Sequence, residues 1–192
     1  MSTTLRQAVV ALRLLVVMTV VLGIAYPAAL WAIGRVVPAP SEGSFVASSS
    51  GKVVGSSLIG QDFQGPQWFH PRPSAAGTGY DALSSSGSNL SAGNPDLVKA
   101  VAQRKADVAA ADGILPAAVP PDAATASGSG LDPDISPEYA AVQVAAVARA
   151  RGLTVAAVAA LVAEHTTGRT LGFIGEPRVN VLELNLALEQ MR

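Results

Sequence analysis

The chain contains no cysteine, and its 192 residues include only two histidines. The absence of cysteine excludes disulfides, thiolate nucleophiles and thiolate metal sites. Charged residues make up only 14% of the chain, and Lys and Arg are not clustered. A nucleic-acid-binding protein needs such a cluster to neutralise phosphates, so the sequence argues against that class of function.

The motifs of self-sufficient enzymes are also missing. The sequence has no P-loop, no dinucleotide-binding glycine pattern after a strand, and no H-E-x-x-H. The run from Ser127 to Gly130 lacks the first glycine of an esterase elbow. His70 and His165 have no other metal-ligand residues in a recognisable spacing around them. The sequence therefore predicts no catalytic residue, no metal site and no cofactor of the chain's own.

The chain does have one long apolar run, residues 14–34, which lies between Arg13 and Arg35 and contains no charged side chain. A helix of about 21 residues spans roughly 31 Å, the thickness of a bilayer's hydrocarbon core. Trp31 suits the membrane interface, and a transmembrane helix tolerates Pro27 if the freed carbonyl is satisfied. The run predicts a transmembrane helix.

Two alternatives to an anchor are a cleaved signal peptide and a buried core helix. The apolar run is longer than a usual signal-peptide core, and Pro27 and Pro40 disturb the best cleavage positions, after Ala29 and Ala39. Buried core helices are usually shorter and carry a polar face. The sequence favours the uncleaved anchor.

The arginines around the run predict its orientation. Arg6 and Arg13 precede it with no acidic residue before it, whereas Arg35 stands alone after it and Glu42 follows. By the positive-inside rule the N-terminus is cytoplasmic, in a single-pass protein of the cell (inner) membrane. The expected organisation is a cytoplasmic arm over 1–13, the span over 14–34, a linker over 35–44 and an extracytoplasmic domain over 45–192.

Turn and cap signals divide the domain. Two β-prone runs, 45–47 and 52–59, flank Gly51 and predict a hairpin. Asn94-Pro95 and Ser136-Pro137 each begin a helix well, and the following Gly113 and Gly152 end these helices. Thr154 caps a third helix to about Thr166. The expected seam of the helical pair around Gly152 consists of Val142, Ala145, Ala146, Val158, Leu161 and Val162.

The C-terminal stretch 179–188 is ambiguous. Leucines alternate with polar residues and alanine, which is a strand period, but the Leu182–Leu186 spacing also suits a helix. We expect a strand that pairs with the hairpin. The predicted fold class is α+β, with a small antiparallel sheet and about three helices. Irregular segments are expected over 61–94 and 114–130, with the aromatic residues of the first fixing it to the domain.

Three stretches combine backbone-setting Gly or Pro with polar residues, namely 69–75, 125–137 and 175–188. Arg72 lies between two prolines, whose stiff backbone could present the guanidinium to a carboxylate, phosphate or carbonyl. The alternative is an internal ion pair with Asp81 or Asp132. The candidate partner-binding or structural residues are Arg72, Pro73, Asp132, Arg178 and Asn180.

These stretches and several others match, in order, the motifs of a known protein family. GKVVGSSLIGQ (51–61), RPSA (72–75), GYDA (79–82), SGSNL (86–90), TASGSGLDPDISP (125–137) and GEPRVNVLELNLAL (175–188) follow a single N-terminal span in order. The chain resembles, over nearly its whole length, the C subunit family of the bacterial potassium-transporting Kdp ATPase. Two departures are Asp134, where the family often has His, and Ser91-Ala92-Gly93, where it usually has Gly-Pro-Thr.

The resemblance implies an accessory subunit of an ATP-driven potassium uptake pump. Its implied partners are a channel-like potassium-translocating subunit and a P-type ATP-hydrolysing subunit, which handle potassium and ATP. It also implies a role in assembly of the complex, and a role as a catalytic chaperone that raises the ATP affinity of the hydrolysing subunit. The resemblance also suggests nucleotide-binding residues, which are Ser86, Gly87, Ser88, Asn89 and Leu90.

The nucleotide suggestion conflicts with the orientation, because ATP is cytoplasmic and the domain is expected on the other side. We therefore interpret 86–90 as a structural loop, and any effect on ATP affinity as allosteric. Small residues offer the span surfaces for packing on a partner helix: Gly23, Ala25, Ala28, Ala29 and Ala32. The alternative function is a freestanding membrane-anchored envelope enzyme or solute-binding domain.

Overall fold

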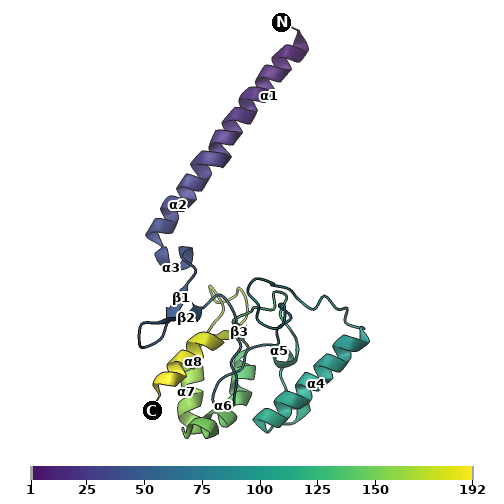
Figure 1. Cartoon of the computed structure of the whole chain (residues 1–192), viewed down its shortest axis with the longest axis vertical. Coiled ribbons are helices and arrows are strands. Elements are labelled where there is room, and N and C mark those ends of the chain that lie inside the picture. The colour runs from purple at the N-terminus through teal and green to yellow at the C-terminus, as the bar shows by residue number, and fades with distance from the viewer. Residues whose placement is uncertain (1, 192) are drawn as a thin grey trace. The chain divides into compact units, whose positions relative to one another are not determined.

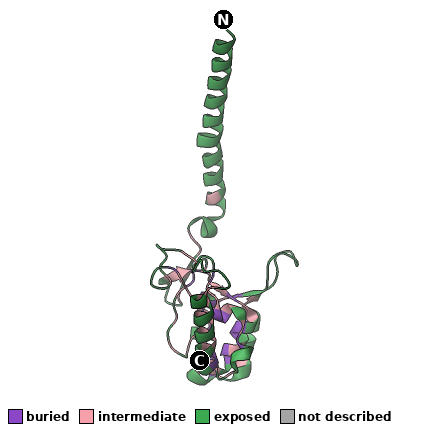
Figure 2. Cartoon of the chain, turned by 90° about the vertical axis from the view of Figure 1, so that its right-hand side faces the viewer, coloured by how far each residue is buried: buried purple, intermediate pink, exposed green. Residues whose placement is uncertain are grey.

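The computed structural model describes residues 2–191, and the chain divides after Ser44 into two compact units. In the first unit, α1 (Thr3–Val20), a π-helical turn (Val21–Ala25) and α2 (Tyr26–Val36) form one continuous helix (Figure 1). This helix of 34 residues is long and apolar enough to cross a membrane, and none of its most apolar window is buried. In Figure 2 nearly the whole helix has the green colour of exposed residues.

The π-helical turn lies just before Pro27. Proline has no N–H to donate to the carbonyl four residues earlier, so an ideal α-helix cannot continue through it. The helix widens there instead, and the Tyr26 N–H donates to the Val21 carbonyl, five residues back. Pro27 is thus accommodated without ending the helix. The expected linker contains a further short helix, α3 (Pro38–Ser41).

The second unit opens with the predicted hairpin. β1 (Phe45–Ala47) pairs antiparallel with β2 (Val53–Ser56), and Gly51 has the left-handed φ of 80° that the turn requires. The second strand is shorter than the β-prone run 52–59. These two strands form a sheet of their own.

The helices predicted from cap signals are confirmed. They are α4 (Pro95–Asp112), α6 (Pro137–Arg151) and α7 (Val155–Glu164). The Asn94, Ser136 and Thr154 side chains each accept a hydrogen bond from a first-turn N–H, as N-caps should. Gly113 and Gly152 end the first two helices in the left-handed conformation.

The residues of the predicted seam between α6 and α7 are buried or half-buried, with the exception of Ala145. Val158 and Val162 of α7 are buried, Leu161 is half-buried, and on α6 Val142 and Ala146 are half-buried while Ala145 is exposed. The buried side chains of α6 are Tyr139, Ala140, Gln143, Val144, Val147 and Ala148. Ala and Val occur on all sides of this helix, so its faces differ little in hydrophobicity and the sequence does not indicate which one is buried.

The predicted strand over 179–188 is wrong. Only β5 (Arg178–Asn180) is extended, and α8 (Val181–Gln190) follows directly. The Asn180 side chain caps α8 by accepting from the Glu183 N–H at 3.1 Å. Leu184 and Leu188, one turn apart, are fully buried. The helical period therefore prevails because it places these two leucines on the same buried face.

β5 is the centre of a second sheet and does not pair with the hairpin. It lies between β3 (Asp134–Ile135) and β4 (Thr166–Thr167), antiparallel to both. The fold class is α+β, as predicted. Residues 61–94 hold no helix or strand, in agreement with the sequence. Residues 114–130 include two short helical turns, a 3-10 turn (Pro116–Ala118) and α5 (Pro121–Ala124).

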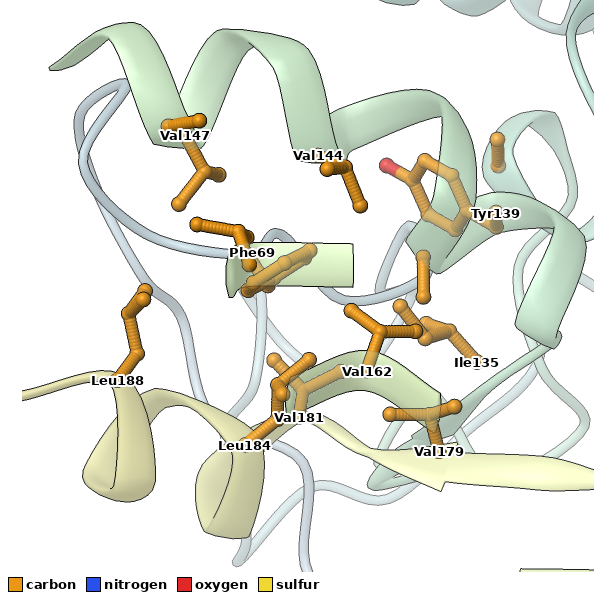
Figure 3. Close-up of a cluster of buried hydrophobic side chains, with 14 of the residues drawn as sticks. Phe69, Ile135, Tyr139, Val144, Val147, Val162, Val179, Val181, Leu184 and Leu188 are labelled. Carbon is orange, nitrogen blue, oxygen red and sulfur yellow. The ribbon is translucent and has the colours of Figure 1, made fainter. Parts of the chain in front are cut away.

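Phe69 lies in the middle of the hydrophobic core and has no exposed surface. In Figure 3 its ring lies below Val144 and Val147 of α6 and above Leu184 of α8. The long irregular loop thus contributes a central core residue. Burying a phenylalanine contributes on the order of 1.5–3 kcal/mol to stability, which explains why the loop is held to the helices.

Candidate functional site

The three stretches singled out in the sequence meet at one cleft of about 540 Å³. Arg72 comes from the first, Asp132 and Asp134 from the second, and Arg178 from the third. β3 and β5, which pair side by side, carry Asp134 and Arg178. We call this feature the acidic cleft. Its complete lining is Arg72, Pro120, Pro121, Asp122, Asp132, Asp134, Ile135, Ser136, Glu138, Glu176, Pro177 and Arg178.

Ion pairs connect the walls of the acidic cleft. Arg72 Nη1 lies 2.9 Å from Asp132 Oδ2, so the predicted internal ion pair is confirmed with Asp132 as the partner. Arg178 Nε lies 3.0 Å from Asp134 Oδ2. The Asp134 N–H donates to Asp132 Oδ1 at 3.0 Å, which joins the two pairs into one network. All four side chains are partly exposed, so each pair stabilises the fold by only about 1 kcal/mol or less.

Asn180 ties this network to the hairpin segment. Its Nδ2 donates to the Ser57 carbonyl at 2.8 Å and to Asp134 Oδ1 at 3.4 Å, while its Oδ1 caps α8. Pro73, the remaining candidate, does not line the acidic cleft and borders a separate pocket of about 300 Å³ beside α4.

The acidic cleft carries five carboxylates and two guanidinium groups. Partial burial raises the pKa of Asp134, and the neighbouring Arg178 opposes that rise. Asp122 accepts hydrogen bonds from the Ser136 N–H and hydroxyl, at 2.7 and 2.9 Å. The two arginines and four of the five carboxylates have partners inside the domain, so the cleft has the geometry of a structural network with an excess of negative charge.

The arrangement lacks the elements of a catalytic centre. Among residues 2–191 no group of three or more His, Asp or Glu side chains is placed to hold a metal ion. His70 Nδ1 lies 3.0 Å from the Phe63 carbonyl, and His165 Nδ1 lies 3.0 Å from the Leu161 carbonyl. Both rings are engaged by backbone near them in sequence, and neither lines the acidic cleft.

One backbone hydrogen bond and one close backbone approach position the start of the loop 86–90. The Ser86 N–H donates to the Ser129 carbonyl at 2.9 Å. A Cβ at Gly87 would come within 2.9 Å of the Gly128 carbonyl oxygen, so only glycine fits there without a shift. Ser88, Asn89 and Leu90 are exposed, and none of the five residues lines the acidic cleft.

The five small residues predicted to pack on a partner helix are all exposed. Gly23 and Ala25 lie in the π-helical turn, and Ala28, Ala29 and Ala32 lie on α2. From Ala25 onward their spacing is i, i+3, i+4 and i+7, the pattern of a single helix face. The exposed face is available for close approach of another helix.

Two buried amides that the sequence did not predict, Gln143 and Asn185, hold the irregular loop to the helices. Asn185 exchanges two hydrogen bonds of 2.9 Å with the backbone N–H and carbonyl of Phe69. Gln143 does the same for His70, at 2.6 and 3.2 Å. A signal existed for Gln143, which lies one helical turn from Tyr139 and one from Val147 on the face those residues bury.

The comparisons with known proteins agree and cover nearly the whole chain. The family model described as "K+-transporting ATPase, c chain" matches residues 8–190. A protein from Kineococcus radiotolerans named "Potassium-transporting ATPase KdpC subunit" is 62% identical, over 98% of this chain and 95% of its own length. Proteins of the same name from Beijerinckia indica and Mycobacterium bovis are 51% and 47% identical, over 91% and 97% of this chain and 89% and 99% of their own lengths.

Proposed function

The chain belongs to the family of the K+-transporting ATPase c chain, KdpC, and we propose that its domain works outside the cytoplasm as a non-catalytic part of the pump. The match over residues 8–190 carries the subunit role, because it includes both the apolar helix and the domain. An accessory subunit needs no catalytic centre, and the acidic cleft supplies none.

The orientation is supported by the charges that flank the helix. Arg6 and Arg13 precede its most apolar part, and Arg35 alone follows it closely. Cytoplasmic flanks of membrane helices carry an excess of Lys and Arg, so the N-terminus lies inside and the domain outside. The protein is then a single-pass protein of the cell membrane.

In this orientation the loop 86–90 does not meet cytoplasmic ATP. Its packing on residues 128–130 gives it a structural role in the domain. The subunit raises the ATP affinity of the hydrolysing subunit through a coupling free energy between the two sides of the complex. The chain holds no nucleotide of its own, and the other subunits handle ATP and potassium.

The domain docks on the outer surface of the potassium-translocating subunit, over its mouth. After Arg35 the chain carries ten Lys and Arg against fourteen Asp and Glu, and five of these acids line the acidic cleft. The resulting negative potential favours cations near the mouth. Salt screens it beyond about 8 Å, so only ions close to the surface feel it.

The test is purification of the affinity-tagged full chain, co-expressed with the other pump subunits, in mild detergent. We expect it to elute with the large polytopic subunits and with potassium-stimulated ATPase activity. A chain that elutes alone, with a hydrolase or solute-binding activity of its own, would instead support a freestanding envelope protein and overturn the proposal.

A further inference from the structure

The segment between β4 and β5, residues 168–177, is exposed at every position and carries three large apolar side chains. Leu171, Phe173 and Ile174 expose 79, 71 and 51% of their surface. We call this segment the apolar arm. Single exposed apolar residues are ordinary, but three within four positions at the tip of one arm form a patch that interaction surfaces characteristically carry.

The apolar arm has a defined shape although no core surrounds it. Thr170 and Ile174 exchange two backbone hydrogen bonds of 2.9 Å, and the Gly172 N–H donates to the Arg169 carbonyl at 3.0 Å. An ion pair between Arg169 and Glu176 closes its base. Its backbone is therefore ordered by local contacts and not by burial.

Part of that shape is strained. Leu171 has φ of 55° and the next residue, Gly172, has φ of 83°. A leucine in the left-handed region costs on the order of 1 kcal/mol, and backbone strain of this kind is found at functional sites such as ligand clamps and switch regions. Preorganising a binding segment lowers the entropy lost when it docks.

We propose that the apolar arm is a docking knob that inserts Leu171 and Phe173 into an apolar pocket on a partner subunit of the pump. This inference rests on the proposed function, since it requires a protein complex. The only charges of the arm, Arg169 and Glu176, pair with each other, so the matching pocket is uncharged.

The same composition argues against a lipid surface as the occupant. Segments that bind at the bilayer interface combine apolar side chains with several Lys or Arg and often with Trp. The apolar arm has no Lys, no Trp and no unpaired Arg. A fixed backbone shape improves binding to a protein pocket of matching shape, but it gives no such advantage at a fluid bilayer.

The first experiment combines Leu171→Ser and Phe173→Ser in the tagged full chain and measures how much of the other pump subunits it retains in detergent. We expect at least about a tenfold loss of recovery, as for the removal of a hot-spot anchor. Leu83→Ser is the matched control, because Leu83 is 99% exposed in another loop and its change should leave recovery unaltered.

The second experiment replaces Phe173 with photoreactive p-benzoylphenylalanine and irradiates intact membranes. We expect an adduct with a pump subunit, and none from the same substitution at Leu83. Adducts with lipid alone, with a second copy of the chain, or with no protein would overturn the inference. The inference would also be overturned if the double variant retained the other pump subunits as well as the wild-type chain does.

The two proposals can fail separately. If the wild-type chain retains no pump subunit, the proposed function fails and the arm inference with it. If the wild type retains the subunits and the arm variants do so equally, only the arm inference fails.

Discussion

Replacing Asn185 tests how the irregular loop is held to the core. Asn185 is 1% exposed, Phe69 has no exposed surface, and the two residues exchange two hydrogen bonds of 2.9 Å across 116 positions of sequence. Asn185→Leu keeps a side chain of similar size and leaves the Phe69 N–H and carbonyl buried without partners. Each orphaned group costs about 1–3 kcal/mol, so we expect the two together to lower the free energy of unfolding by roughly 2–6 kcal/mol.

Trp68 lies beside this contact and reports on it. The chain has two tryptophans, so a Trp31→Phe background leaves Trp68 as the only one. Urea unfolding of the full chain in detergent micelles, followed by Trp68 fluorescence, gives the midpoint. With a slope of about 2 kcal/mol per molar urea, the midpoint should fall by roughly 1–3 M.

Two further variants separate the hydrogen bonds from packing. Gln190→Ala, exposed on the same helix, should leave the midpoint unchanged. Asn185→Asp keeps the acceptor but not the donor, so it should be more destabilising at pH 7 than near pH 5, where a protonated acid can donate. If Asn185→Leu behaves like Gln190→Ala, the reasoning about buried amides is refuted.

Three other predictions concern charge, the acidic cleft and the apolar helix. Burial raises the pKa of Asp112 to about 6, so its charged form is disfavoured in the folded state; stability therefore falls as pH rises through this range. Asp112→Asn should match the wild type near pH 4 and exceed it by about 1–2 kcal/mol at pH 8 in urea titrations, and equal values at both pH would contradict the shift. A double-mutant cycle of Arg72→Met and Asp132→Asn should give a coupling of about 0.5–1 kcal/mol that shrinks in 1 M salt, whereas a salt-independent value would exclude the ion pair. An unrelated span in place of residues 14–34 should keep the chain in the membrane but reduce recovery of the pump subunits, and full recovery would exclude the helix face with Ala28 and Ala32 as an assembly interface.

Local signals in the sequence predicted local structure well. The caps Asn94, Ser136 and Thr154 begin helices in the structure because their partners lie within three residues. The start of α8 was missed, although Asn180 and Glu183 offer the same kind of cap, because the alternating leucines suggested a strand. Burial of Leu184 and Leu188 in the same core cluster as Phe69 decides between the two periods, and that burial is a tertiary effect.

The candidate site could be predicted only in part. Its three stretches were identified from their composition, and the ion pair of Arg72 with Asp132 was one of two alternatives. Their assembly around β3 and β5 depends on strand pairing across about 45 residues, which no local pattern specifies. The amides Gln143 and Asn185 were missed because they bind backbone groups 73 and 116 residues away. Backbone N–H and carbonyl groups occur at almost every position, so the sequence does not indicate which of them will be bound.

The side of the membrane on which the domain lies is the central claim, because it decides whether the subunit can touch ATP. The chain has no cysteine, so Ser88→Cys introduces a single exposed thiol in the loop 86–90. Thr4→Cys, near the start of α1, is the matched control on the other side. We expect a membrane-impermeant thiol reagent to label Ser88→Cys in intact cells, and Thr4→Cys only after the cells are permeabilised. Labelling of Thr4→Cys alone in intact cells would contradict the account and restore direct contact with ATP.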